Sequence, residues 1–388
     1  MTVEEEFTIY EGTPYHVGFP DVEKAPNGDI IVVFRLGSAH VWGRDGKIYL
    51  SRSKDKGKTW ETKEALHIPG RFIKYEGEYR LLSDDRDPSI KALSNGKMIL
   101  SWFHWGEGDR DNPTSSIYIS ISNDNGETWE DPRLVFFNGA TSDKILEAEK
   151  GLLFLPAYGT LSESYSSAFL IISENYGETW EEKPIVIVNG NKFRINFYEP
   201  AIAKVNEKEL ICVLRTDIGP LYLSRSKDNG ETWSEPEPLP FYGHAPHLLK
   251  LINGDLILSF RDVELYFTEK WFWEKLLYNL GLREENPSSP FPKGELLPET
   301  TVIVKASPPE YNFKNSEKKI IYKPKGYIME NGDILFGDSG YPSAIELEDN
   351  KILFVLYEAP YGYRGKYSPW SRIIGIKIEI GEPGRGDK

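Results

Sequence analysis

Five prolines each open a predicted strand, and the residue before each proline differs. These preceding residues are Phe19, Asp87, Glu199, Ala245 and Tyr341. Proline is tolerated at the start of a strand because its missing N–H is not needed there. Each strand is followed by a turn and a second strand that returns to the same end. The last residues of the returning strands are Arg35, His104, Arg215, Arg261 and Glu358. The pattern therefore predicts one site where these side chains gather.

The chemistry that this set allows starts with Tyr341 and Glu199. A tyrosine between an arginine and a glutamate can lose its proton to the glutamate and act as a nucleophile. Nearby arginines keep carboxylates ionised and can bind an anionic group of a substrate. We expect substrate binding by Arg35, Arg86, Asp87, Arg215, His244, Arg261 and Glu358. The alternative for each arginine is a buried ion pair that only stabilises the channel.

The histidines give no sign of a metal site. His244 and His247 lie three residues apart on a strand-like segment, so their side chains are expected on opposite faces. No metal and no other cofactor is predicted.

Four copies of an eight-residue box set the positions of the strands. Each box reads Ser-x-Asp-x-Gly-x-Thr-Trp, with Asn for Asp in one copy, and the four span 53–60, 122–129, 173–180 and 226–233. Asp or Asn bonds its own backbone two residues on, and Gly adopts the positive φ of a tight turn. Each box therefore predicts a hairpin, and the repetition indicates a repeat architecture. The boxes are expected at the end of the strands opposite the site.

A second repeat predicts the fold class. A strand, a turn such as Asn27-Gly28 and an apolar strand occur six times. With two further strands per unit, this predicts an all-β, six-bladed β-propeller forming a single domain over residues 1–388. Phe7 and Ile9 are expected in an outer strand that closes the last blade.

Residues 264–300 interrupt the fifth blade with an apolar spacing typical of a helix. This short helical insertion is expected to pack on the propeller or on another subunit of a homo-oligomer. The alternative is a lid over the site.

The composition excludes several other functions. Lys and Arg number 46 against 60 Asp and Glu, a formal charge of −14, which argues against nucleic acid or an anionic membrane as partner. The single cysteine, Cys212, lies in an apolar run and is expected to be buried. No apolar run is long enough to span a bilayer, and no signal peptide is visible. We therefore expect a cytoplasmic protein.

Over nearly the whole chain, the boxes and strand-opening motifs resemble the sialidase (neuraminidase) superfamily of BNR or Asp-box propellers. The resemblance implies that Glu199 is the catalytic glutamate and that Arg215 belongs to a triad of arginines that binds a carboxylate. It also implies that Tyr341, in Gly-Tyr-Pro-Ser-Ala, is the nucleophile, with Glu358 as a supporting glutamate. Arg35 matches another arginine of the family's pocket.

Two positions depart from the family's pattern. Phe19 stands where the family has the first arginine of its triad, in an Arg-Ile-Pro motif. Where the family's general-acid aspartate is expected, shortly after Arg35, this chain has Ser-Ala-His ending at His40. His40 is a candidate replacement, because imidazole titrates in the range that acid catalysis uses. Arg261 is the candidate for the third arginine of the triad.

Three functions fit these residues, and each makes a carbohydrate the expected partner. The first is a glycosidase of sialidase-like fold acting on an acidic sugar other than sialic acid. The second is a carbohydrate-binding propeller without catalysis. The third is a polysaccharide lyase that uses Tyr341 or a histidine as its base at a uronate. A screen of glycan products separates the three.

Overall fold

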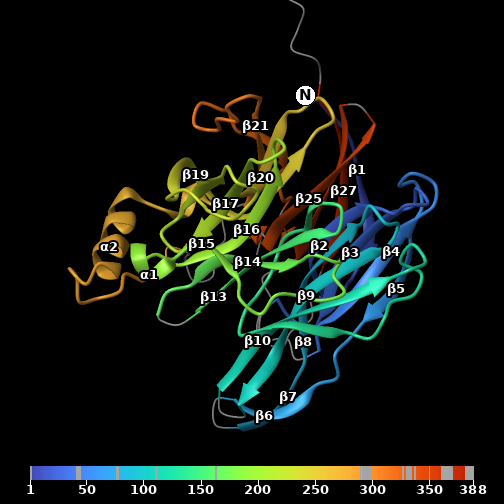
Figure 1. Cartoon of the computed structure of the whole chain (residues 1–388), viewed down its shortest axis with the longest axis horizontal. Coiled ribbons are helices and arrows are strands. Elements are labelled where there is room, and N and C mark those ends of the chain that lie inside the picture. Colours follow the sequence, from blue (N-terminus) through green and yellow to red (C-terminus); the bar gives the residue numbers. More distant parts are fainter. Residues whose placement is uncertain are drawn as a thin grey trace, which may run out of the picture.

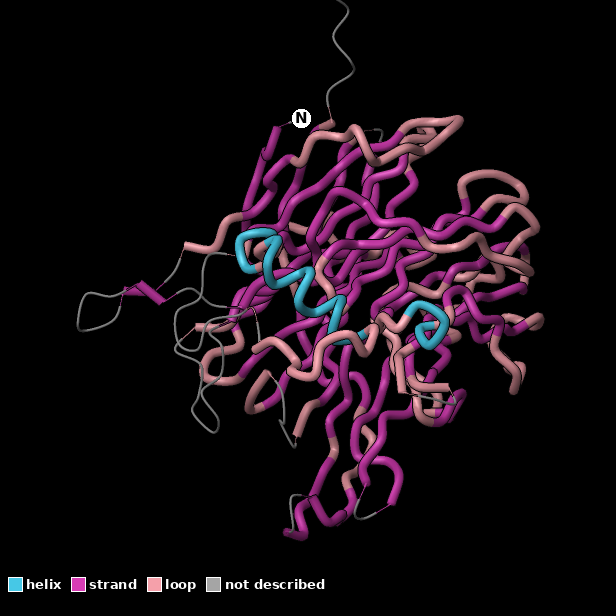
Figure 2. Tube along the Cα trace, turned by 90° about the vertical axis from the view of Figure 1, so that its left-hand side faces the viewer, coloured by secondary structure: helices cyan, strands magenta, loops and turns pink. Residues whose placement is uncertain are grey.

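The structure, a computed structural model, describes residues 2–40, 45–75, 78–109, 112–161, 164–288, 290, 299–325, 327–328, 334–335, 338–348, 350–359 and 370–380. Strands make up nearly all of its regular structure, and helix is confined to short segments (Figure 2). The chain folds into a propeller-like ring of antiparallel sheets (Figure 1).

Three four-stranded sheets come first along the chain, and each is built from consecutive strands. One has β2 (His16–Lys24), β3 (Ile30–Gly37), β4 (Lys47–Ser53) and β5 (Glu61–Leu66). The next has β8 (Asp84–Ala92), β9 (Met98–Asp109), β10 (Asn112–Ser122) and β11 (Arg133–Phe137). The third has β12 (Leu146–Glu149), β13 (Leu152–Gly159), β14 (Ser167–Ser173) and β15 (Ile185–Val188).

A longer run of seven strands follows. It contains β16 (Phe197–Lys204), β17 (Leu210–Thr216), β18 (Pro220–Ser226), β19 (Glu237–Lys250), β20 (Leu256–Asp262), β21 (Thr300–Ala306) and β22 (Lys319–Tyr322). The first half of β19 pairs with β18 and its second half pairs with β20. One strand therefore serves as the last strand of one unit and the first strand of the next.

The last sheet joins both ends of the described chain. It has the order β1 (Thr2–Glu11), β27 (Arg372–Glu379), β26 (Lys351–Ala359) and β25 (Asp338–Glu348). Phe7 lies opposite Gly375 in the β1–β27 pair, which confirms the prediction that the N-terminal strand closes this sheet. Two short hairpins complete the strands: β6 (Arg71–Tyr75) with β7 (Glu78–Leu82), and β23 (Tyr327–Ile328) with β24 (Ile334–Leu335).

The core lies between neighbouring sheets. Ile31 and Val33 of β3 are fully buried against Met98 and Leu100 of β9 in the next sheet. Residues 30–34 are an unbroken apolar run, as expected for a strand that is covered on both faces. Cys212 of β17 is fully buried in the same kind of layer, as predicted.

The boxes are tight turns, as predicted. In the last copy Ser226 Oγ donates to Asp228 Oδ1 at 2.8 Å, and Thr232 N donates to the same oxygen at 2.9 Å. Gly230 has a φ of 92° and donates its N–H to Ser226 Oγ at 2.8 Å. Hydrogen bonds from Thr232 lower the pKa of the Asp228 carboxyl to about 2, so the turn holds an ionised carboxylate.

Helical structure is limited in the described residues. It comprises α1 (Gly190–Phe193), the 3-10 turn η1 (Glu264–Tyr266) and α2 (Glu269–Asn279). α2 lies in the predicted insertion, between β20 and β21, at one edge of the ring (Figure 1). It is fixed to the neighbouring unit, where Lys275 Nζ is 3.7 Å from Asp217 Oδ2. Association of subunits through 264–300 stays a prediction, and residues 289 and 291–298 of this segment lie outside the described residues. Among the helices described, none is both long and apolar enough to cross a membrane.

Candidate active site

Five strands carry the same irregularity at the same position. In β2, β8, β16, β19 and β25 the pairing with the next strand shifts register at the X-Pro dipeptide. The residue before proline has a positive φ in every case, between 48° and 56°. We call these the bulge residues: Phe19, Asp87, Glu199, Ala245 and Tyr341. A positive φ is uncommon for residues other than glycine and often marks a functional site.

The bulges explain why the site assembles. A β-bulge inserts one extra residue and redirects its side chain, and proline fits there because it has no N–H to leave unpaired. Four of the five bulge residues, with their prolines, line one small cavity of about 20 Å³ on the channel, which also contacts Asp21, Asp143 and His247. This volume holds about one water molecule.

Tyr341 and Glu199 form the centre of the site. The hydroxyl of Tyr341 donates to Glu199 Oε1 at 2.6 Å. Arg215 Nη1 donates to the same oxygen at 2.8 Å, and the backbone N–H of Ala245 donates to Oε2 at 2.8 Å. Burial, then the negative charges of Glu199 and Asp87, raise the pKa of Tyr341 well above its ordinary value. The resting pair is therefore a neutral phenol hydrogen-bonded to a carboxylate.

Asp87 differs from the other carboxylates of the site. Its side chain is 4% exposed, and Oδ1 has no hydrogen-bond partner among the described residues. Burial is the main cause that raises its pKa to about 7, with Arg86 opposing and Glu199 adding to the shift. Near neutral pH this carboxyl is divided between its protonated and ionised forms.

Two of the predicted substrate-binding arginines are committed to buried ion pairs. Arg35 is fully buried, and its Nε lies 2.6 Å from Asp84 Oδ1. Arg261 is 5% exposed, and its Nη2 lies 2.6 Å from Asp338 Oδ1. In both pairs the arginine comes from the end of a returning strand and the aspartate from the neighbouring sheet. These contacts match the structural alternative considered for the arginines.

The other two arginines face more open space. The side chain of Arg215 is 29% exposed, the largest value among the four. Arg86 is 13% exposed and lies over the Phe19 ring, with 4.8 Å between the guanidinium carbon and the ring centroid. Arg86 Nη1 also donates to the backbone oxygen of His40 at 2.7 Å. Arg215 and Arg86 are thus the better placed of the four to meet an anionic group.

His40 lies beside Phe19, with 5.4 Å between the two ring centroids. Its Nδ1 is 2.7 Å from Asp338 Oδ2. Burial outweighs the attraction of Asp338 and lowers the pKa of His40 below its ordinary value. The imidazole is therefore mostly neutral at pH 7.

His16, His40 and Asp338 place their ligand atoms within 4.8 Å of one another, close enough to hold a metal ion. The charge balance opposes a cation there. Asp338 is already paired with Arg261, and Arg86 adds a positive charge beside His40. The geometry thus allows a metal, whereas the electrostatics do not favour one.

The structure does not bring Glu358 to the site. Its carboxylate accepts from Tyr322 Oη at 2.7 Å and from Arg372 Nη2 at 2.9 Å, on the other face of β26. Gly340 precedes the bulge residue Tyr341, and the residue opposite Gly340 is Tyr357, one position before Glu358. A step of one residue moves a side chain to the other face of a strand, so Tyr357 occupies the position that Arg215 has in its own sheet.

His104 is also one position away from the place predicted for it. Phe103, and not His104, lies opposite Arg86, the residue before the bulge residue Asp87. His104 is buried with its Nδ1 2.9 Å from Asp85 Oδ1. His244 does lie beside the site. Its pKa is well below the ordinary value because of burial and then the positive charges of Arg215 and Arg261.

Three residues of the site were not predicted: Asp84, Asp338 and Tyr357. Tyr357 Oη donates to Asp338 Oδ2 at 2.5 Å. Asp84 and Asp338 each lie three residues before a bulge residue, so alignment of the units at this position could have found both.

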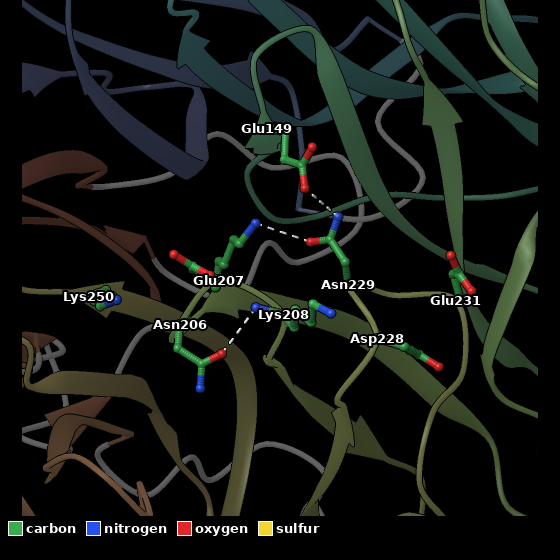
Figure 3. Close-up of a pocket in the computed structure, with 9 residues that line it drawn as sticks. Glu149, Asn206, Glu207, Lys208, Asp228, Asn229, Glu231 and Lys250 are labelled. Atoms are coloured by element: carbon green, nitrogen blue, oxygen red, sulfur yellow. Dashed lines mark hydrogen bonds between the residues drawn. The ribbon is translucent and has the colours of Figure 1, made fainter.

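A larger pocket lies at the opposite end of the strands. It has a volume of about 870 Å³ and is lined by the last box and by the turn between β16 and β17 (Figure 3). Its polar groups bond one another: Lys204 Nζ donates to Asn229 Oδ1 at 3.1 Å, and Asn229 Nδ2 donates to Glu149 Oε1 at 3.1 Å. The bulge residues contribute nothing to this pocket.

Comparisons with known proteins show what this chain is similar to. Residues 87–262 match the BNR repeat-like domain. A sialidase of Bacteroides fragilis is 25% identical over 211 residues, 48% of this chain and 37% of that protein. A sialidase of Paraclostridium sordellii is 27% identical over 214 residues, 46% of this chain and 52% of that protein. The matches thus span about half or less of these relatives' length. Residues 87–262 are thus similar to a BNR repeat domain, and the distant homologues of the chain are sialidases.

Solved structures support the same fold. A protein of unknown function from Dyadobacter fermentans has a TM-score of 0.73 and 19% identity, covering 98% of this chain and 99% of that one. NanB sialidase from Streptococcus pneumoniae has a TM-score of 0.62 and 14% identity, covering 97% of this chain and 70% of that one. The ring of sheets is therefore a sialidase-like propeller fold.

Proposed function

We propose that this protein is a glycoside hydrolase with a six-bladed, sialidase-like propeller, in which Tyr341 is the nucleophile and Glu199 its base. The observation that carries the proposal is the 2.6 Å hydrogen bond from Tyr341 Oη to Glu199 Oε1. Two residues 142 positions apart in sequence, each in a strained backbone conformation, meet at hydrogen-bond distance.

The arrangement suits transfer of a proton from Tyr341 to Glu199. A neutral phenol is a weak nucleophile, and a base at hydrogen-bond distance activates it as the new bond forms. Arg215 and the N–H of Ala245 fix both oxygens of Glu199, so the carboxylate needs no reorientation to accept the proton. Tyr341 Oη then bonds the anomeric carbon, and water later hydrolyses this intermediate, as in sialidases, which use tyrosine in place of the usual carboxylate.

The substrate that fits is an acidic glycan. A carboxylate nucleophile would be repelled by an anionic sugar, whereas a phenol is not, and Arg215 and Arg86 present positive charge to the same space. Phe19 occupies the position where the sialidase resemblance places an arginine, so we propose an acidic sugar other than sialic acid.

The test is a panel of aryl glycosides of uronic acids, sialic acid and neutral sugars, assayed for release of the aryl group. On any substrate that is turned over, Tyr341→Phe and Glu199→Gln should each lower kcat by roughly 10³-fold or more. Tyr311→Phe is the matched control, because Tyr311 is also buried and loses a hydrogen bond, to Gly254 O at 3.1 Å, away from the site. Its kcat should be unchanged.

Other outcomes would support the alternatives. Products that absorb in the ultraviolet from uronate polymers would indicate β-elimination and a lyase. Binding of acidic oligosaccharides without any turnover would indicate a carbohydrate-binding propeller. Full activity of Tyr341→Phe would contradict the proposal.

A further inference from the structure

Asp87 is the one bulge residue besides Tyr341 and Glu199 that carries an ionisable side chain. Asp87 and Tyr341 line the same small cavity on the channel. Glu199 is fixed by three donors, but Oδ1 of Asp87 has no hydrogen-bond partner in the described part of the chain. An unpaired polar atom in a buried position is costly and needs an explanation.

The charges around Asp87 come from four other strands as well as its own. They are Asp84 and Arg86 on β8, Arg35 on β3, Tyr158 on β13, Glu199 on β16 and Tyr341 on β25. Positive and negative neighbours oppose each other, and burial then raises the pKa of Asp87 to about 7. The carboxyl therefore carries a proton in a large fraction of molecules at neutral pH, and it can also release one.

His40, the candidate general acid from the sequence, is less suited to this step. Its Nδ1 is directed to Asp338 Oδ2 at 2.7 Å, and its pKa lies below the ordinary value. A neutral imidazole has little tendency to donate a proton to a leaving group. Asp87 carries a proton in a large fraction of molecules, has an oxygen without a partner among the described residues, and lines the same cavity as the nucleophile.

We propose that Asp87 is the general acid and base of the reaction. This inference rests on the proposed glycosidase function. As Tyr341 Oη bonds the anomeric carbon and gives its proton to Glu199, the glycosidic C–O bond breaks and its electron pair stays on the leaving oxygen. Asp87 protonates that oxygen. In the second step Asp87 takes a proton from the attacking water, the C–O bond to Tyr341 breaks, and Tyr341 regains its proton from Glu199.

The test compares substrates with good and poor leaving groups. Asp87→Asn should lower kcat/KM for an oligosaccharide or alkyl glycoside by roughly 10²–10³-fold, because these leaving groups need a proton. The same variant should lower kcat/KM for an aryl glycoside of an acidic phenol by less than about 10-fold, because that phenolate leaves unaided. The alkaline limb of the pH profile of kcat/KM should disappear in the variant. Added azide should speed the second step, since azide needs no base.

His40→Gln is the comparison variant, and it should affect both classes of substrate equally. Equal losses on both classes in Asp87→Asn, or a loss that depends on the leaving group in His40→Gln alone, would overturn the assignment. Unfolding curves establish that each variant is folded. Asp87→Glu keeps a carboxylic acid at this position, so it should retain part of the activity on substrates with poor leaving groups. Failure of the proposed function would look different, because Tyr341→Phe would then remain active.

Discussion

Tyr341 and Glu199 occupy the same position on two different sheets, and their side chains meet at 2.6 Å. Each has a positive φ, 50° for Tyr341 and 48° for Glu199, immediately before a proline. The strain is repeated in every sheet that contributes a bulge residue, including Phe19 and Ala245, which carry no acid or base. The bulge is therefore a property of the repeat, and the chemistry depends on which residue stands at it.

The nucleophile and its base should behave as one unit. Tyr341→Phe removes the donor and Glu199→Gln removes the acceptor of the same proton transfer. The kcat of the double variant should therefore be less than about 10-fold below that of the less active single variant. The measurement is kcat on one activated glycoside for the two single variants and the double variant. Losses that multiply in the double variant would mean that the two groups act in separate steps.

The arginines should divide into stabilising and substrate-binding residues. Asp84→Asn leaves Arg35 buried without its anion and should lower the free energy of unfolding by about 3–5 kcal/mol. The control is Glu64→Gln, which breaks an exposed pair with Lys47 and should cost less than about 1 kcal/mol. Urea unfolding measures both.

Arg215 has no such partner in the next sheet, because the position three residues before Ala245 is Tyr242 and not an aspartate. Arg215→Met should therefore raise KM for anionic substrates by roughly 10-fold or more, the loss of one charge-assisted bond. A change in stability with unchanged KM would show that Arg215, like Arg35, stabilises the fold and does not bind the substrate.

Two glycines of equal φ allow the role of the boxes to be measured. Gly28 and Gly230 both have a φ of 92°, but a Cβ on Gly28 would meet nothing within 4 Å, whereas one on Gly230 would lie 3.1 Å from Phe154. Gly28→Ala should cost about 1 kcal/mol from backbone strain, and Gly230→Ala about 1 kcal/mol more from crowding. Thermal unfolding checks the difference. A folded but inactive Gly230→Ala would show that the box contributes to catalysis.

Asp87 should make the protein less stable as the pH rises. Its folded pKa of about 7 exceeds the value of 3.8 for an unperturbed aspartate, so between these values the folded state holds a proton that the unfolded chain has released. Stability from this group is complete below about pH 4 and falls through pH 7. Relative to the wild type, Asp87→Asn should therefore gain stability from pH 5 to pH 8. A difference that stays constant across this range would contradict the raised pKa.

Local signals were enough to predict the centre of the site. Proline marks the start of each of these first strands, and a polar turn that contains asparagine marks its end, so Tyr341, Glu199 and Arg215 could be placed at one end of the strands without any contact information. The positive φ at the bulges was not predicted, because it arises from pairing with the next strand.

Because of the same bulges, the residues of the returning strands could not be aligned correctly from the sequence. The extra residue on the first strand changes which residue lies opposite it, and an assignment one position off put Glu358 where Tyr357 lies. The pairing of Arg35 with Asp84 was also missed, because the two residues are 49 positions apart and lie in different sheets. Asp84 is found only when the units are aligned three residues before the bulge residue.

If Tyr341 is the nucleophile, it forms a covalent bond to the sugar, and this intermediate can be trapped. The enzyme is incubated with a fluorinated, activated analogue of the glycoside that it turns over, and the protein is then digested and analysed by mass spectrometry. One added glycosyl group is expected on the peptide that contains Tyr341, in both the wild type and Asp87→Asn, and none in Tyr341→Phe. A glycosyl group on Glu199 or Asp87, or turnover by Tyr341→Phe with no adduct in any variant, would contradict this role of Tyr341.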